Sequence, residues 1–267
     1  MSVSTDTSDL AGLVAFAHEL ADAAGREILP RFRVPIAVAN KHKAGGFDPV
    51  TEADRAAEIA MRALVKARRP GDGILGEELG HEPGTGPFTW VFDPIDGTRA
   101  FMAGLPVWGT LIALLDGDRP VLGVLDQPFL GERFLGHDGH AELRSHGATT
   151  TLRSRSDAAL KDAILCATTP DMFKGEEIAR FGAVAARARL TRYGTDCYAY
   201  GMLAAGFVDL VIEASLKPYD ILAHIPIVEG AGGIVTNWQG GPAYAGGRCI
   251  AAANKAIHAE ALAILAG

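Results

Sequence analysis

The sequence has few cysteines, no long apolar run and no excess of basic residues. Its 267 residues include three cysteines, widely spaced and without a Cys-x-x-Cys motif. This usage argues against a disulfide scaffold and indicates reduced thiols in a cytoplasmic protein. No apolar stretch approaches the roughly 20 residues of a membrane-spanning helix, so no membrane partner is expected.

Charge and composition narrow the class of protein further. The net charge of −7 argues against a nucleic-acid binder, which needs a basic surface. A small anionic substrate stays compatible with that charge, because bound divalent cations reverse the local field. Residues 1–6 lack the basic segment and apolar core of a secretory signal. A hydrophobic content of 48% with 21% charged residues is typical of a globular protein.

Periodicity and turn residues predict the elements of the first half. We expect a helix over residues 8–32 with Ser8 as its N-cap, a strand at 36–38, a mobile loop over 41–48, a helix over 51–69, a short strand ending at Phe92, and a hairpin of strands 107–115 and 121–125.

A segment rich in Gly, His and Ser over residues 136–150 indicates a boundary. We therefore divide one compact unit into an N-terminal half, 1–145, and a C-terminal half, 146–267. Alternating strands and helices in the second half indicate layered sheets covered by helices. The expected strands are 164–167, 190–193, 207–212, 234–236 and 249–252, and the expected helices are 176–189, 198–205, one opening at Asp220 and one capped by Asn254.

The motif Asp93-Pro94-Ile95-Asp96-Gly97-Thr98 follows the apolar run Trp90-Val91-Phe92. Pro94 cannot extend a strand ladder and Gly97 allows a sharp bend, so two carboxylates fall on a turn at a strand end. Oxygen ligands in such an arrangement suit Mg²⁺. The alternative is an ordinary Asp-Pro and Asp-Gly turn.

Further carboxylates stand at other predicted element ends. Glu77 follows the apolar pair Ile74-Leu75, Asp54 lies in the first turn of the 51–69 helix, and Asp220 opens a helix. Each has a structural alternative: Thr51 and Asp54 fit a capping box, Asp220 favours a helix dipole, and Glu77 fits solvated charge.

Together these motifs resemble the inositol monophosphatase family of metal-dependent phosphatases. The resemblance extends from about residue 43 to residue 238, and the Asp-Pro-Ile-Asp-Gly-Thr core is its most specific part. Residues 104–111 and 192–200 look most like the histidinol-phosphatase branch. The resemblance implies a layered α-β-α-β-α sandwich of the sugar-phosphatase type and a homodimer.

The resemblance also implies two or three Mg²⁺ ions per site, with Mn²⁺ as the alternative. Glu77, Asp93 and the Ile95 carbonyl would hold the first ion. Asp93, Asp96 and Asp220 would hold the second, and Glu77 would help to place a weaker third. Paired cations of this kind activate the attacking water and stabilise the leaving oxygen.

The remaining implied roles concern water, phosphate and leaving group. Asp54 and Thr98, with Glu77 nearby, would orient the attacking water as catalytic residues. Gly97 and Thr98 would donate backbone N–H groups to the phosphate. Attack would be direct, with no phosphorylated side chain.

Three residues indicate the substrate. Glu213 and Asp196 would face the leaving alcohol, and two carboxylates there suit a cationic alcohol such as histidinol. Arg99, beside the phosphate turn, would add a charge-assisted contact or pack at a subunit interface. The alternative for Asp196 is an ion pair with Arg192.

The leading hypothesis is therefore a Mg²⁺-dependent phosphatase that hydrolyses L-histidinol phosphate in histidine biosynthesis. The nearest alternative is the same chemistry on inositol 1-phosphate or another sugar phosphate. An alternative of another class is an accessory protein that binds the transcription machinery.

Overall fold

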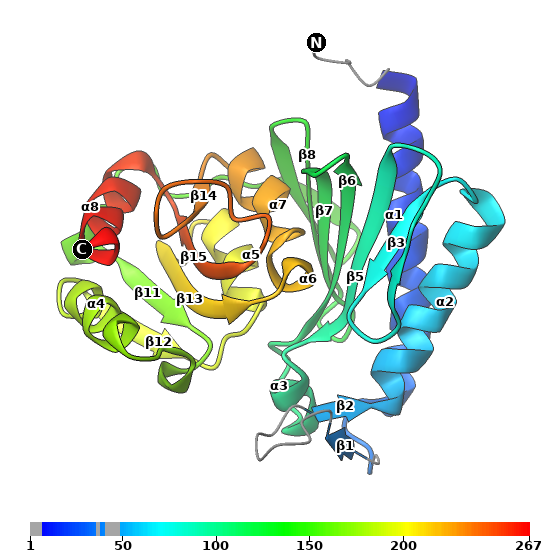
Figure 1. The fold of residues 1–267 in the computed structure, drawn as a ribbon, viewed down its shortest axis with the longest axis horizontal. Helices are drawn as coiled ribbons and strands as arrows, with labels where there is room; N and C mark the ends of the chain where they lie inside the picture. The colour runs from blue at the N-terminus through cyan, green and yellow to red at the C-terminus, as the bar shows by residue number, and fades with distance from the viewer. Residues whose placement is uncertain (1–6, 36–37, 41–48) are drawn as a thin grey trace.

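The computed structural model describes residues 7–35, 38–40 and 49–267. The chain forms two large β-sheets with helices outside and between them (Figure 1). Buried apolar clusters fill each space between a sheet and its helices. The order of layers is helices, sheet, helices, sheet, helices, which confirms the predicted α-β-α-β-α sandwich.

The eight-stranded sheet lies at one end of the molecule, with the order β10-β9-β8-β7-β6-β5-β3-β4, and β1 pairs with β2 beside it. The elements up to residue 151 are α1 (Thr7–Ile28), the 3₁₀ helix η1 (Leu29–Arg31), β1 (Val38–Asn40), β2 (Pro49–Thr51), α2 (Glu52–Arg68), β3 (Gly73–Gly76), β4 (Gly80–Glu82), β5 (Phe88–Asp96), α3 (Thr98–Met102), β6 (Gly109–Asp116), β7 (Arg119–Gln127), β8 (Glu132–His137), β9 (His140–Ser145) and β10 (Ala148–Thr151).

The five-stranded sheet has the order β12-β11-β13-β15-β14. The elements that build it and cover it are the 3₁₀ helices η2 (Leu160–Asp162) and η3 (Pro170–Met172), β11 (Ile164–Ala167), α4 (Glu176–Ala185), β12 (Leu190–Tyr193), α5 (Tyr198–Ala204), β13 (Leu210–Leu216), α6 (Pro218–Ile221), α7 (His224–Gly230), β14 (Ile234–Asn237), β15 (Gly247–Ala252) and α8 (Lys255–Ala266).

Helices α1 and α2 cover the outer face of the eight-stranded sheet (Figure 1). The predicted apolar face of α1 is confirmed, since Leu13, Leu20 and Ile28 are all buried. The helix begins at Thr7, so Ser8 lies inside it rather than at its N-cap. It ends at Ile28 because Pro30 belongs to the 3₁₀ helix that follows. None of the described helices is long and apolar enough to cross a membrane.

The segment at residues 136–150, where we placed a boundary, contains strands β9 and β10, which extend the eight-stranded sheet. The Gly and polar residues form two tight hairpin turns, Asp138-Gly139 and His146-Gly147, in which all four residues have positive φ. The division between residues 145 and 146 falls between two strands of this sheet. The change of sheet comes later, between Thr151 and Ile164, and a division into two halves stays a prediction.

Several element bounds differ from the sequence prediction. Helix α4 ends at Ala185, four residues before the predicted end at 189. Strand β13 covers Leu210–Leu216 instead of 207–212, so Glu213 lies inside the strand. Residues 36, 37 and 41–48, predicted as strand and loop, lie outside the described residues. Asn254 caps α8 as predicted, accepting a hydrogen bond from the Ile257 N–H at 3.0 Å.

Helices α6 and α7 lie between the sheets (Figure 1). Helix α6 packs on β5 and β6, and α7 packs closely on β7 and β8. Two glycines permit this approach. A Cβ at Gly123 would stand 2.0 Å from the Ala223 carbonyl oxygen, and one at Gly136 would stand 2.3 Å from the Ile227 nitrogen. Because α7 directly follows α6, which carries Asp220, these contacts hold the segment next to this candidate ligand against the first sheet.

A methyl group at Gly123 tests this contact. Gly123→Ala must push α7 off the sheet, and overpacking of this kind costs about 1–3 kcal/mol. We expect a fall in Tm of about 2–4 °C for each kcal/mol, measured by thermal denaturation. Gly12→Ala is the matched control, because Gly12 is an exposed helical position with nothing within 4 Å and alanine favours helix. Equal Tm values for Gly123→Ala and the unmodified protein would contradict the close-packing argument.

Candidate active site

Strand β5 carries Asp93 and Asp96 into the space between the sheets. Its apolar residues Trp90 and Phe92 are fully buried and anchor the strand. The pairing with β6 shifts register between Asp93 and Asp96, and a bulge of this kind re-aims side chains. The Thr110 hydroxyl donates to the Pro94 carbonyl at 2.8 Å and holds the bulge. Both carboxylates can therefore face the same side of the sheet.

The turn after β5 depends on Gly97, whose φ is +81°. The Thr98 hydroxyl donates to the Ile95 carbonyl at 3.0 Å, and this oxygen keeps a second lone pair. A Cβ at Gly97 would stand 3.1 Å from the Cβ of Asp196 and 3.2 Å from the Cα of Trp108. The missing side chain thus lets Asp196 pack directly on the turn.

Glu77 lies beside Asp93 because β3 and β5 run parallel with Gly76 opposite Phe92. The Glu77 N–H donates to the Phe92 carbonyl at 3.1 Å. A buried carboxylate, Glu58, holds the following turn by accepting from the Glu78 N–H at 2.8 Å. Carboxyl ends of parallel strands meet at one edge of a sheet, as the sequence prediction for Glu77 requires.

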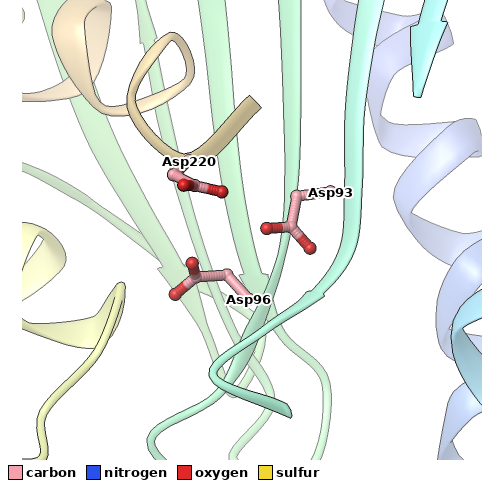
Figure 2. A group of neighbouring side chains, drawn as sticks. All are labelled: Asp93, Asp96 and Asp220. Carbon is pink, nitrogen blue, oxygen red and sulfur yellow. The ribbon is translucent and has the colours of Figure 1, made fainter. Parts of the chain in front are cut away.

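Asp220 reaches the same place from α6, between the sheets. Its Oδ2 accepts from the Lys217 N–H at 2.7 Å, a cap on the short helix. Carboxylate oxygens of Asp93, Asp96 and Asp220 all lie within 4.8 Å of one another. Figure 2 shows the three side chains converging from the strand, the turn and the helix. This is the predicted second set of metal ligands.

A cavity of about 330 Å³ opens over these carboxylates. Ten of the predicted site residues line it, and Asp54 is the predicted site residue that does not. The ten are Glu77, Asp93, Ile95, Asp96, Gly97, Thr98, Arg99, Asp196, Glu213 and Asp220.

Burial and mutual repulsion make this cluster costly without cations. Burial, and then the charges of Glu77, Asp96 and Asp220, raise the pKa of Asp93 well above its usual value. Burial and the charges of Asp220, Asp196 and Glu213 do the same for the pKa of Asp96. One oxygen of Asp93, Oδ1, is buried without a hydrogen-bond partner in the described part of the chain. A set of oxygen donors with excess negative charge fits hard divalent cations.

Asp54 lies in the first turn of α2 and forms the capping box that the sequence suggested. Its Oδ2 accepts from the Thr51 N–H at 2.8 Å and from the Thr51 hydroxyl at 2.6 Å. Its Oδ1 is buried and has no partner among the described residues. Burial, with the charge of Glu77 acting in the same direction, raises the pKa of Asp54 to about 6. The cap therefore uses one oxygen and leaves the other available.

Asp196 and Glu213 line the part of the cavity that the second sheet contributes. Asp196 has a φ of +42°, and burial raises its pKa to about 6 against the opposing charge of Arg99. The alternative ion pair with Arg192 is not among the ion pairs of the described residues. Glu213 accepts from the Thr168 N–H at 3.0 Å and from the Tyr200 hydroxyl at 3.0 Å.

The cavity has further lining residues that the sequence analysis missed, among them Thr168, Tyr200, Lys217 and His224. A signal existed for two of them. Tyr200 follows Asp196 by four positions and His224 follows Asp220 by four, the spacing that places residues on one helix face. Both lie in mostly apolar stretches, a pattern that predicts core positions, and both are buried.

The raised pKa values predict how Mg²⁺ stabilises the protein at different pH. The pKa of Asp220 is about 7 in the folded chain against a usual 3.8, so the folded state binds more protons between these values. Its contribution to stability is therefore lost as pH rises through this range, and cations replace protons there. We expect the Tm increase caused by Mg²⁺, relative to EDTA, to grow from pH 5.5 to pH 8.

The comparison of Mg²⁺ with EDTA isolates the acidic cluster. Burial lowers the pKa of His224 to about 3 and that of His18 to about 4, and these groups affect both arms equally. Asp220→Asn is the matched variant and should flatten the pH dependence of the Mg²⁺ effect. A Mg²⁺ effect that is largest at pH 5.5 would contradict the assignment of the cluster.

Comparison with known proteins agrees with this geometry. A bifunctional phosphatase of *Arabidopsis thaliana*, the chloroplastic IMPL2, is 43% identical over 236 residues, which are 87% of this chain and 66% of that protein. The histidinol-phosphatase of *Streptomyces coelicolor* is 37% identical over 259 residues, 93% of this chain and 95% of that protein. The solved structure of an inositol monophosphatase from *Zymomonas mobilis* matches with a TM-score of 0.85 and 41% identity, covering 99% of this chain and 100% of that one.

The model of the inositol monophosphatase family matches residues 9–266. The match includes every element that contributes a side chain to the cavity. The chain therefore belongs to the inositol monophosphatase family of metal-dependent phosphatases.

Proposed function

We propose that this protein hydrolyses L-histidinol phosphate to L-histidinol and phosphate with Mg²⁺. The observation that carries the proposal is the acidic character of the cavity beyond the metal carboxylates. Asp196 and Glu213 both line that region, and a leaving alcohol that carries a cationic amine would pair with them. An unpaired cation or carboxylate buried there would be costly, so the pairing favours a charged alcohol over a neutral polyol.

The relatives support phosphatase chemistry and leave the alcohol open. The *S. coelicolor* relative is named a histidinol-phosphatase, and the *Z. mobilis* structure is named an inositol monophosphatase. Inositol 1-phosphate is therefore the second candidate substrate, favoured by the higher identity of that structure. We favour histidinol phosphate because Asp196 and Glu213 would lie near the leaving group.

The metal carboxylates would perform the chemistry common to both substrates. Asp93, Asp96 and Asp220 would hold one Mg²⁺, and Glu77 with Asp93 and the Ile95 carbonyl would hold another. Bound Mg²⁺ supplies Lewis-acid activation of water and neutralises charge on the phosphate. Mn²⁺ has the same ligand preferences and would substitute for it.

The chain's own residues would orient the water and the phosphate. Asp54 has one oxygen fixed by the cap of α2, and its other oxygen, which has no partner among the described residues, would accept a proton. Thr98 would orient the same water from the start of α3. The N–H groups of Gly97 and Thr98 would bind the phosphate, because the first N–H groups of a helix lack intrahelical acceptors. Attack on phosphorus would be direct and in line, without a phosphorylated side chain.

A cytoplasmic location and a homodimer remain predictions from the sequence. Exposed apolar side chains at Val34, Leu105 and Phe129 support a subunit contact near α3, the region where Arg33 donates to the Gly104 carbonyl at 3.0 Å. Arg99 follows the phosphate turn on the same helix. Binding to the transcription machinery stays the alternative of another class, and the assays below separate it from catalysis.

Asp93→Asn tests the metal chemistry. Asp93 contributes to both proposed cation sites, so its neutralisation should lower kcat by at least about 10³-fold, in line with the loss of a principal electrostatic group. The fold should persist, because the change removes repulsion among buried carboxylates. Phosphate release and thermal denaturation measure the two effects. Asp118→Asn, in the exposed hairpin turn, is the control. Turnover near the unmodified level in Asp93→Asn would reject the site.

A substrate panel tests the leaving-group assignment. We expect kcat/KM for L-histidinol phosphate to exceed that for inositol 1-phosphate, fructose 1,6-bisphosphate and 3′-phosphoadenosine 5′-phosphate by about 100-fold, or about 2.7 kcal/mol. Asp196→Asn should reduce this preference while retaining the fold, because asparagine tolerates the positive φ at this position. A flat profile, or inositol 1-phosphate ahead, would overturn the substrate. No release from any of the four would favour the binding alternative.

A further inference from the structure

The side chains of Tyr200 and His224 form a parallel stack inside the protein. Their ring centroids are 4.1 Å apart and their planes differ by 4°. Tyr200 comes from α5 and His224 from α7, the helices between the two sheets (Figure 1). Both rings line the candidate cavity, and both are buried, with His224 fully so. The stack therefore forms part of the wall next to the second sheet.

Tyr200 connects this stack to Glu213. Its hydroxyl donates to Glu213 Oε2 at 3.0 Å. The other oxygen, Oε1, accepts from the N–H of Thr168 at 3.0 Å and from the Thr168 hydroxyl. Glu213 is thus held on both oxygens, by Thr168 directly after β11 on one side and by α5 on the other. Removal of the Tyr200 contact would leave its carboxylate pinned at one end only.

The imidazole of His224 contributes a flat surface in this arrangement. Neither ring nitrogen has a hydrogen-bond partner in the described ranges, and both are shielded from solvent. Burial lowers the pKa of His224 to about 3, so the ring is neutral at physiological pH. Because its nitrogens are shielded from solvent, the ring influences Glu213 indirectly, through the face that stacks on Tyr200.

The backbone explains why the two rings meet. The Cys197 N–H donates to Asp96 Oδ2 at 2.9 Å, which fixes the start of α5 on the metal turn. Tyr200 follows within one helical turn. His224 lies one turn after Asp220, where the Ala223 carbonyl packs against β7 at Gly123. The stack therefore joins α5, whose start is hydrogen-bonded to Asp96, to the segment that follows Asp220.

We infer that His224 and Tyr200 are positioning residues for leaving-group recognition: the His224 ring fixes the Tyr200 ring, and Tyr200 fixes the Glu213 carboxylate. This inference rests on the proposed function in that Glu213 is taken to face the leaving alcohol. His224 thereby acts on specificity through two intermediaries, without touching substrate. It gives the first sheet, through α7, an influence on a contact that the second sheet provides.

A double-mutant cycle tests the chain of contacts, using the best substrate of the panel at saturating Mg²⁺. His224→Ala and Tyr200→Phe should each lower kcat/KM by about 10-fold, mainly through KM, since Glu213 binds the leaving group in both ground and transition states. In a Glu213→Ala background neither change should lower kcat/KM by more than about 2-fold. The inhibition constant of inorganic phosphate, which has no leaving group, should stay constant throughout.

His224→Phe separates the ring from its nitrogens. Phenylalanine keeps the stack and removes two unpaired polar atoms, so kcat/KM should return to within about 2-fold of the unmodified value and Tm should not fall. Loss of kcat/KM in His224→Phe equal to that in His224→Ala would mean that a nitrogen serves the substrate, and would overturn the inference. Additive effects of His224→Ala and Glu213→Ala would overturn it as well.

Phe181→Ala provides the matched control for loss of a buried ring. Phe181 stacks on Phe173 at 4.2 Å on the far side of the second sheet. The Phe181→Ala variant should lower Tm as His224→Ala does, and it should leave KM unchanged. The result of the double-mutant cycle does not depend on which alcohol the enzyme prefers. The cycle compares variants that have Glu213 with variants that carry Glu213→Ala, all on the same substrate. A flat panel with a non-additive cycle would thus reject histidinol phosphate and retain the positioning role.

Discussion

The repulsion among buried carboxylates is the constraint on which this structure depends. Asp93 and Asp96 are held between two sheets together with Asp220 and Glu77, and burial raises the pKa of the three aspartates. Such a cluster is unfavourable in a folded protein unless protons or cations neutralise it. The surrounding layers make it possible by supplying apolar cores on each side and by fixing the carboxylates from three places, strand β5, the turn after β3, and α6. Cation binding and folding should therefore be coupled, because the negative charge that destabilises the metal-free protein is the charge that would hold a divalent cation.

Two irregularities in otherwise regular strands position the site. Strand β5 changes register between Asp93 and Asp96, and β13 changes register between Glu213 and Leu216. A regular strand would send alternate side chains to opposite faces of the sheet, whereas a bulge re-aims them. In β13 the irregularity includes Ser215 with a φ of +65° and leads directly to the α6 segment. Each sheet therefore delivers its carboxylates to the space between the sheets at the point where its pairing is interrupted.

The sequence predicted the parts of the fold that local chemistry determines. The turn at 93–98, the capping box of Thr51 and Asp54, and the alternation of strands and helices after residue 160 all follow from short-range patterns. It did not predict β9 and β10, because both strands are rich in polar residues, β10 is exposed throughout, and their tight turns resemble a linker. It also missed His224 and Tyr200, because a buried aromatic position looks the same in sequence whether it packs in a core or in the wall of a cavity. Ring stacking across two helices depends on tertiary structure and leaves no local pattern.

The division of work between the sheets has a consequence for specificity. In our proposal the first sheet, with α6, supplies the groups that would act on phosphate, and these groups would serve any monoester. The second sheet and the segments that flank it supply Asp196, Thr168 and Glu213, which line the same cavity and which we propose to recognise the leaving alcohol. Changes on the second sheet can thus alter the preferred alcohol without disturbing the carboxylates of the first. The Tyr200–His224 stack is the exception, because it links the residues of the second sheet to the first sheet. His224 belongs to the segment that packs on the first sheet. A change in the Tyr200–His224 stack should therefore affect both substrate selectivity and the metal-binding carboxylates, because His224 lies on α7. A residue's place in this stack should matter more for that coupling than its distance from the carboxylates.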